Sequence, residues 1–214
     1  MAKDDQKFRK VITPVFRGSF LNLFEPSQFG DGEPKYDITA LFYPEKFTPR
    51  DKQRFKEMQV LADEVSVRAF GKPYRQLPAN FKKPFRDGAE KSDLEGFEEG
   101  KPFARMSSKQ RPGLVDLHGN DIVDRSEIYP GAWFRATVTA YSYENKGKGV
   151  AFGLNNIQKI ADGDRLDSRA NAAADFANEE VDEEWLKAAE ENSKPTDEEH
   201  DPLSTEGIDD EIPF

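Results

Sequence analysis

The sequence contains no cysteine, and this absence excludes several kinds of chemistry. Without thiols the chain cannot form disulfides, use a cysteine nucleophile or bind zinc through thiolates. It has only two histidines, His118 and His200, and the second lies in the acidic C-terminal region. We therefore expect neither a Ser-His-Asp triad nor a histidine-rich metal cluster in the body of the chain. We expect no enzymatic activity, no metal and no cofactor.

Long apolar runs are also missing. No stretch of about eighteen apolar residues, the length that suggests a membrane-spanning helix, occurs in the sequence. The first five residues, Met1-Ala2-Lys3-Asp4-Asp5, are too polar to begin a signal peptide. Together with the lack of cysteine, these features lead us to expect a cytoplasmic protein with no membrane partner.

Charged residues are abundant and unevenly distributed. They make up 34% of the 214 residues, against 36% hydrophobic residues, so part of the chain must remain in water. The net charge of -10 by itself argues against a nucleic-acid partner. However, residues 175–214 contain 16 Asp and Glu against two Lys, which leaves 25 acids and 29 bases in residues 1–174. The body is therefore mildly basic, with a net charge of +4, and an acidic region follows it.

Alternating apolar and β-branched residues predict strands in most of the body. Thr48-Pro49 with Asp51 predicts the beginning of one helix, which ends before Gly71. Residues 71–100 mix Pro, Gly, Lys and aromatic residues without a period, and we interpret them as a long loop. Antiparallel strands with one inserted helix favour a small barrel over a parallel α/β sheet. The strands are expected over residues 11–24, 35–43, 103–109, 113–117, 133–144 and 149–160.

The chain is expected to have three parts. Residues 1–165 form the barrel domain, in which a turn at residues 145–148 joins the last two strands. Residues 166–191 form a partly helical linker, with short helices over 170–177 and 182–191. Residues 192–214 form a disordered acidic tail, because this polar segment offers too few apolar groups to pack into a core.

The C-terminal tip is the most specific feature of the sequence. It resembles the terminal peptide of bacterial single-stranded DNA-binding proteins, in which acids precede Ile-Pro-Phe and the free carboxylate. A terminal Phe ring can fill an apolar pocket while the carboxylates meet Arg and Lys at the pocket rim. The alternative is a solubilising tail that happens to end in three apolar residues. The predicted partner-binding residues, which would contact replication or recombination proteins, are Asp209, Asp210, Glu211, Ile212, Pro213 and Phe214.

Basic residues are interleaved with aromatic residues in three segments, 81–86, 101–111 and 141–148. Proteins that bind single strands hold the backbone in a positive groove and stack bases on aromatic rings. Tyr141 and Tyr143 share one face of a predicted strand, so both would meet a ligand or both would enter the core. For any single ring, core packing remains an alternative to stacking. The predicted DNA-binding residues are Lys82, Lys83, Phe85, Arg86, Phe103, Arg105, Lys109, Arg111, Tyr141, Tyr143, Lys146 and Lys148.

The body resembles the phage-type family of single-stranded DNA-binding proteins that was once catalogued only as a domain of unknown function. The resemblance implies an OB fold, here a five-stranded antiparallel barrel with one inserted helix, and sequence-tolerant binding of single-stranded DNA. It also suggests a homodimer and a bacteriophage replication or recombination protein in the host cell cytoplasm. The matching stretches are residues 18–24 with 35–39, residues 110–116, and residues 129–134 through 148–150.

Other functions remain open at this point. A metal-dependent nuclease would need only carboxylates, and the turn Asp162-Gly163-Asp164 offers two. A protein-binding adaptor would use the barrel without touching DNA. Gly147-Lys148-Gly149 lacks the spacing of a phosphate-binding loop, and a hairpin turn is favoured there.

The acidic tail is also expected to occupy the DNA groove until DNA displaces it.

Overall fold

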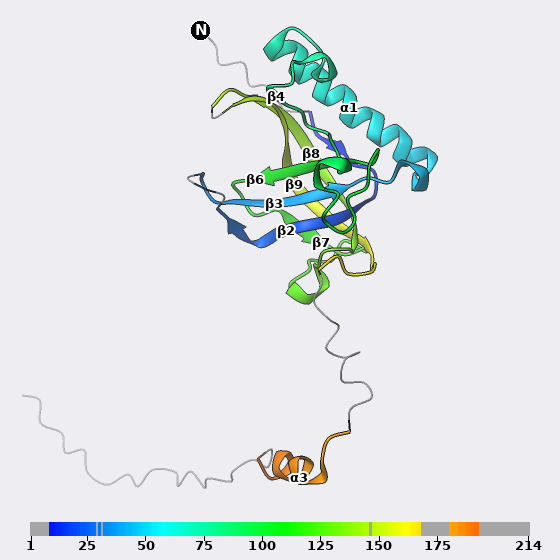
Figure 1. Cartoon of the computed structure of the whole chain (residues 1–214), viewed down its shortest axis with the longest axis vertical. Helices are drawn as coiled ribbons and strands as arrows, with labels where there is room; N and C mark the ends of the chain where they lie inside the picture. Colours follow the sequence, from blue (N-terminus) through cyan, green and yellow to red (C-terminus); the bar gives the residue numbers. More distant parts are fainter. Residues whose placement is uncertain (1–8, 29, 31, 146, 168–179, 193–214) are drawn as a thin grey trace, which may run out of the picture. The chain divides into compact units, whose positions relative to one another are not determined.

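The computed structural model describes residues 9–28, 30, 32–145, 147–167 and 180–192 (Figure 1). Residues 1–168 and 169–214 form two units, and each is described by itself. The second unit contains helix α3 (Glu183–Asn192), close to the helix predicted over 182–191. The predicted helix over 170–177 and the tail from residue 193 lie outside the described residues.

The first unit contains β1 (Val11–Ile12), β2 (Phe16–Ser27), β3 (Lys35–Leu41), α1 (Pro49–Phe70), β4 (Phe81–Lys82), β5 (Arg86–Asp87), β6 (Pro102–Ser108), β7 (Gly113–Val115), β8 (Trp133–Tyr143) and β9 (Lys148–Ala161). Short 3-10 helices lie at Pro44–Lys46, Tyr74–Gln76, Gly88–Lys91 and Arg125–Glu127.

Five long strands pair in a cycle. β2 pairs with β3 and with β8, β3 pairs with β6, β6 pairs with β9, and β9 pairs with β8. All of these pairs are antiparallel except β6 with β9, which is parallel. The prediction of purely antiparallel strands is therefore wrong at this pair. A cycle of five strands cannot alternate its direction throughout, because five is odd, so one neighbouring pair has to be parallel.

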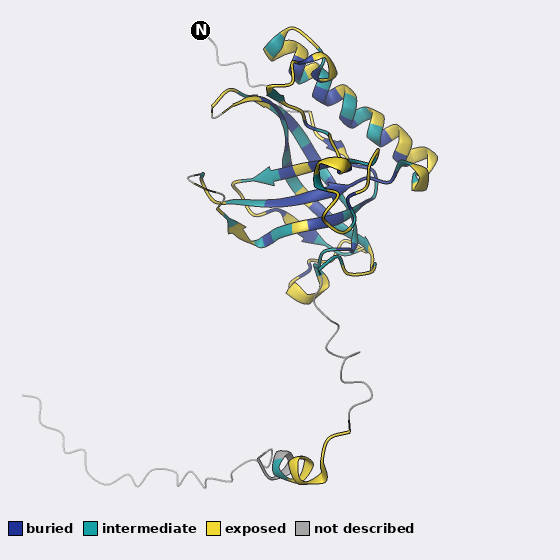
Figure 2. Ribbon diagram, viewed as in Figure 1, coloured by how far each residue is buried: buried dark blue, intermediate teal, exposed yellow. Residues whose placement is uncertain are grey.

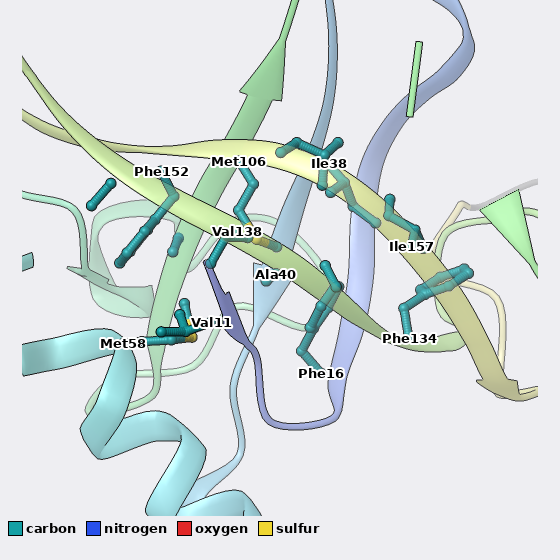
Figure 3. Packing of buried hydrophobic residues seen from close by; sticks show 14 of the residues in the cluster. Val11, Phe16, Ile38, Ala40, Met58, Met106, Phe134, Val138, Phe152 and Ile157 are labelled. Atoms are coloured by element: carbon teal, nitrogen blue, oxygen red, sulfur yellow. The ribbon is translucent and has the colours of Figure 1, made fainter. Parts of the chain in front are cut away.

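The hydrophobic core is built from the inward-facing residues of these strands (Figure 3). Along β8, Phe134, Ala136, Val138 and Ala140 are buried, and the residues between them are less buried. This alternation is the two-residue period of a strand with one face in the core. Part of the other face is covered by a second, smaller hydrophobic cluster of Leu41, Tyr43, Phe97 and Phe103. The core residues that the other long strands contribute include Phe16, Ile38, Met106, Phe152 and Ile157.

Helix α1 begins and ends where the sequence predicts. The Thr48 hydroxyl accepts a hydrogen bond from the backbone N–H of Asp51, and the Asp51 carboxylate accepts one from Thr48, which forms a capping box. Gly71 ends the helix in the left-handed conformation, with φ of 74°. Figure 2 shows a buried stripe along α1, which includes Met58 and Leu61 of the core. Among the described residues, no helix is long and apolar enough to cross a membrane.

The predicted long loop at residues 71–100 is tied to the sheet. β4 pairs in parallel with the beginning of β9, and β5 pairs with the beginning of β6. Each of these strands has two residues, which is too short to produce a periodic pattern in the sequence. The segment therefore contributes to the fold through pairings that sequence patterning does not reveal.

Candidate nucleic-acid interface

The three basic and aromatic segments predicted from the sequence lie next to one another. β4, which contains Lys82, pairs with the beginning of β9, which contains Lys148. β5, which contains Arg86, pairs with β6 beside Phe103. Segment 81–87 thus pairs with the beginning of β6 and with the beginning of β9. β6 and β9 pair with each other only further along, at Met106 and Phe152. The β8–β9 hairpin completes the group, because the end of β8 pairs with the beginning of β9.

One face of β3 and β6 points away from the core, and we name it the outer face. On β6, Ala104 and Met106 are buried in the core, whereas Arg105 between them is exposed. Cross-strand pairing continues this face from β3 through β6 and β9 to β8. At one end of this face Leu41 and Phe103 are covered by the second hydrophobic cluster, and Asp37 and Thr39 are buried as well. The rest of the outer face consists of Asp37, Thr39, Arg105, Ser107, Gly153, Thr139, Tyr141 and Tyr143.

Arg105 is held in place by a buried carboxylate. Its guanidinium forms an ion pair with Asp37, whose side chain is only 5% exposed, while the Arg105 side chain is 52% exposed. The Asn22 amide also donates a hydrogen bond of 2.8 Å to the same carboxylate. A guanidinium has five donors in a rigid fork, so an arginine fixed at one side can still donate to a ligand at the other.

Tyr141 and Tyr143 form an aromatic pair at the hairpin end of the outer face. Their ring centroids are 6.4 Å apart, and partial burial raises the pKa of the Tyr143 hydroxyl. Neither ring belongs to the main core cluster. The nearby position 153 is glycine at a close approach, since a Cβ there would lie 2.6 Å from the Thr139 hydroxyl oxygen and 3.8 Å from the Tyr141 ring. The expectation that both rings share one strand face is confirmed.

The predicted basic residues are exposed and differ in their partners. Lys82 and Lys83 are exposed beside the hairpin, where Lys148 pairs with Glu144 at 3.3 Å. Arg86 donates to Glu90 at 2.8 Å. Lys109 forms an ion pair with Glu33 and lowers the pKa of that carboxyl, and the Arg111 guanidinium lies 5.3 Å from the Phe24 ring centroid. Lys146 and the tip residues 209–214 lie outside the described residues.

Two of the predicted stacking rings are packing residues. Phe103 is 3% exposed and packs against Phe97, with ring centroids 5.1 Å apart. Phe85 contacts four rings of the core, among them Phe42 and Phe152. Phe103 has no free face for a base, so the prediction of stacking is wrong for it, and the partly buried Phe85 is engaged in packing against the core. The sequence could not separate these rings from Tyr141, because their burial depends on pairing between distant segments.

An exposed ring that the sequence did not single out lies near the outer face. Phe20 in β2 is 46% exposed, and its ring centroid is 6.2 Å from that of Phe97. Lys91 lies against the same ring, with its ammonium 4.5 Å from the Phe20 centroid. In the sequence Phe20 has the pattern of an ordinary strand residue, and no local signal distinguishes it from the buried Phe16.

A sequence model of the protein family described as "Enterobacter phage Enc34, ssDNA-binding protein" matches residues 9–186. The chain belongs to this family. The family match includes all the strands of the first unit and reaches into α3. It confirms the resemblance drawn from the sequence. One curated relative, protein p50 of Acyrthosiphon pisum secondary endosymbiont phage 1, is 29% identical over 158 residues, which are 72% of this chain and 85% of p50.

The fold of this Enc34-family chain is similar to that of solved phage proteins. The single-stranded DNA-binding protein from bacteriophage Enc34 in complex with ssDNA has a TM-score of 0.61 at 22% identity, covering 74% of this chain and 89% of that one. Gp2.5, a single-stranded DNA-binding protein of bacteriophage T7, has a TM-score of 0.53 at 16% identity, covering 82% and 96%. At these identities the likeness establishes a shared, mainly β fold with a helix.

No group of three or more His, Asp or Glu side chains that could hold a metal ion occurs in the described part of this Enc34-family chain. Asp162, one of the two acids considered for a metal, instead pairs with Lys159 at 2.8 Å and accepts a hydrogen bond from the Tyr129 hydroxyl. These contacts lower the pKa of the Asp162 carboxyl. The Asp162 carboxylate is therefore bound by protein side chains directly after the end of β9.

Proposed function

We propose that this protein binds single-stranded DNA along the outer face of an OB-type, five-stranded barrel. The cycle of five strand pairings and its single parallel pair support the barrel. In OB folds, oligonucleotides bind on the second and third strands and on the loops between strands one and two and between strands four and five. Among the five long strands, these are β3, β6, the loop at residues 28–34 and the β8–β9 hairpin.

The convergence of the three basic segments at this face is the observation that best supports the proposal. Segments 81–87, 102–108 and 141–149 are joined by strand pairing around the outer face. Their lysines and arginines would neutralise phosphates, and Tyr141 and Tyr143 would stack bases, each stack being worth about 1–3 kcal/mol. The single-stranded DNA-binding protein from bacteriophage Enc34, which has a similar fold, was solved in complex with ssDNA. The shared fold supports a path of the strand along these cations and rings.

The test is a salt titration of oligo-dT binding by fluorescence anisotropy. The triple variant Lys82→Ala, Lys83→Ala, Lys148→Ala should bind at least about tenfold more weakly at low salt. Its slope of log affinity against log salt should fall by about 2, since each phosphate contact contributes about 0.7. The matched control, Lys52→Ala, Lys56→Ala, Arg68→Ala, removes three exposed cations of α1. Equal losses in both variants would contradict a specific interface.

The same material distinguishes the other functions considered from the sequence. Labelled oligo-dT incubated with the protein and Mg²⁺ should stay intact, whereas shortened products would favour a nuclease. A wild-type protein without salt-dependent binding of the oligonucleotide would favour an adaptor.

We also propose, on the resemblance of the tip, that residues 209–214 recruit phage or host replication proteins. The suggested homodimer stays a prediction, which analytical ultracentrifugation would check.

A further inference from the structure

Phe20 is held out of the core by a break in the regularity of β2. Its φ is 47°, and it is the one non-glycine residue in the described part of the chain with a positive φ. The pairing of β2 with β3 shifts register between Ser19 and Asn22, which marks a bulge at this point. A Phe in this conformation is strained, and such strain often occurs at binding sites. The bulge turns a ring that would fit the strand pattern toward solvent.

Lys91 is brought to the Phe20 ring by a loop with a fixed base. The Asp87 carboxylate accepts hydrogen bonds from the backbone N–H groups of Ala89 at 2.9 Å and Gly100 at 3.0 Å. The backbone N–H of Gly88 donates to the carbonyl of Lys101 at 2.9 Å, which closes the loop. The Lys91 ammonium lies 4.5 Å from the Phe20 ring centroid. The position of the lysine is thus set by contacts that do not involve DNA.

Lys91 lies near two arginines, each of which is paired with a carboxylate. Arg86 pairs with Glu90, and Arg105 pairs with Asp37. For Lys91, no ion pair with a described carboxylate is present. Partial burial lowers the pKa of the Lys91 ammonium, the neighbouring Arg86 and Arg105 lower it further, and Asp93 raises it. An ammonium that has lost part of its water gains more from an anion than a fully solvated lysine would.

We propose that Phe20 and Lys91 form a nucleotide subsite, in which a base stacks on the Phe20 ring and the adjacent phosphate binds the Lys91 ammonium. This inference rests on the proposed function and extends the DNA path beyond β3 and β6 to the bulge of β2. The flexible stem of Lys91 lets its ammonium leave the ring for the phosphate when a base arrives. Phe97 contacts the Phe20 ring and is itself packed against Phe103.

The first experiment substitutes the two residues separately and measures oligo-dT binding. Phe20→Leu keeps an apolar side chain on the same strained backbone but removes the ring, and should weaken binding about 5- to 100-fold. Lys91→Ala should reduce the slope of log affinity against log salt by about 0.7. Lys52→Ala, an exposed lysine of α1, is the control and should leave the slope unchanged. Thermal unfolding of each variant shows whether it remains folded.

The second experiment uses the unaltered protein, so that it does not depend on how the variants fold. Ultraviolet irradiation of its complex with oligo-dT, followed by mass spectrometry of peptides, should identify a thymidine adduct at Phe20. Adducts at Tyr141 or Tyr143 without one at Phe20, or normal binding by Phe20→Leu, would overturn the subsite and leave the proposed function in place. Failure of the wild-type protein to bind oligo-dT would instead overturn the proposed function.

Discussion

At the scale of single residues, the Arg105 and Asp37 pair shows how a basic face can have fixed geometry. A buried carboxylate costs free energy unless it is paired and hydrogen-bonded. Here Asp37 receives donors from Arg105 and from Asn22. The result is an arginine whose side chain has lost much of its freedom before a ligand arrives, so less ordering entropy remains to be lost on binding. The ion pair also means that Arg105 adds little net charge to the face.

The first residue-level prediction follows from this arrangement. Arg105→Lys keeps the charge but loses the planar fork, so oligo-dT affinity should fall about tenfold, the equivalent of one charge-assisted hydrogen bond. The slope of affinity against salt should stay unchanged, because no charge is removed. Anisotropy titrations at several salt concentrations measure both quantities. Arg50→Lys, in the exposed first turn of α1, is the control, and a variant of Arg105 that binds like it would refute the role.

At the scale of elements, the segment at residues 81–87 depends on a single close approach. A Cβ at Gly149 would lie 2.2 Å from the carbonyl oxygen of Lys82, a distance that no side chain can occupy. β4 can therefore pair with β9 only because position 149 is glycine. This contact holds Lys82 and Lys83 beside the hairpin and, through β5, helps to place Arg86.

Gly149→Ala should accordingly separate β4 from β9. We expect faster amide hydrogen exchange in residues 81–87 and weaker binding of oligo-dT, because the lysines of this segment lose their positions. The capping box of α1 should be unaffected, since its reciprocal hydrogen bonds join Thr48 and Asp51. Ser142→Ala, an exposed change on the same hairpin, serves as the control. Unchanged exchange in Gly149→Ala would show that the β4 pairing does not position the segment.

At the scale of the whole molecule, opposite charges are segregated along the chain. Residues 192–214 contain eight Asp and Glu against one Lys, whereas residues 1–174 have a net charge of +4. A polyanionic segment joined to a basic body would compete with DNA at a high effective concentration. The competition depends on long-range charge and should weaken as salt increases, since added ions shorten the Debye length to about 10 Å at 0.1 M.

Removal of residues 192–214 should therefore tighten oligo-dT binding, with the largest gain at the lowest salt. Deletion of Phe214 alone is the matched control, because it leaves the acidic side chains in place and should hardly change DNA affinity. Isothermal titration at two salt concentrations measures the difference. Equal or weaker binding by the truncated protein would contradict competition by the tail.

The sequence by itself determined the features that depend on local patterns. The capping box at Thr48 and the alternation along β8 require only neighbouring residues, so the helix and the long strands could be predicted. Charge segregation and the family motifs are likewise properties of the chain, and they indicate the DNA-binding family without knowledge of the fold. The basic segments could also be predicted, because interleaved lysines, arginines and aromatic residues are visible in the sequence itself.

The tertiary structure alone decided which of these residues can meet a ligand. Phe103 and Tyr141 have similar sequence surroundings, yet one is covered by Phe97 and the other faces outward. Phe20 is exposed because a bulge in β2 turns it over, and Lys91 reaches it from a loop about seventy residues away in the chain. Burial and cross-strand register are properties of residues that meet only after folding, and no local pattern specifies them.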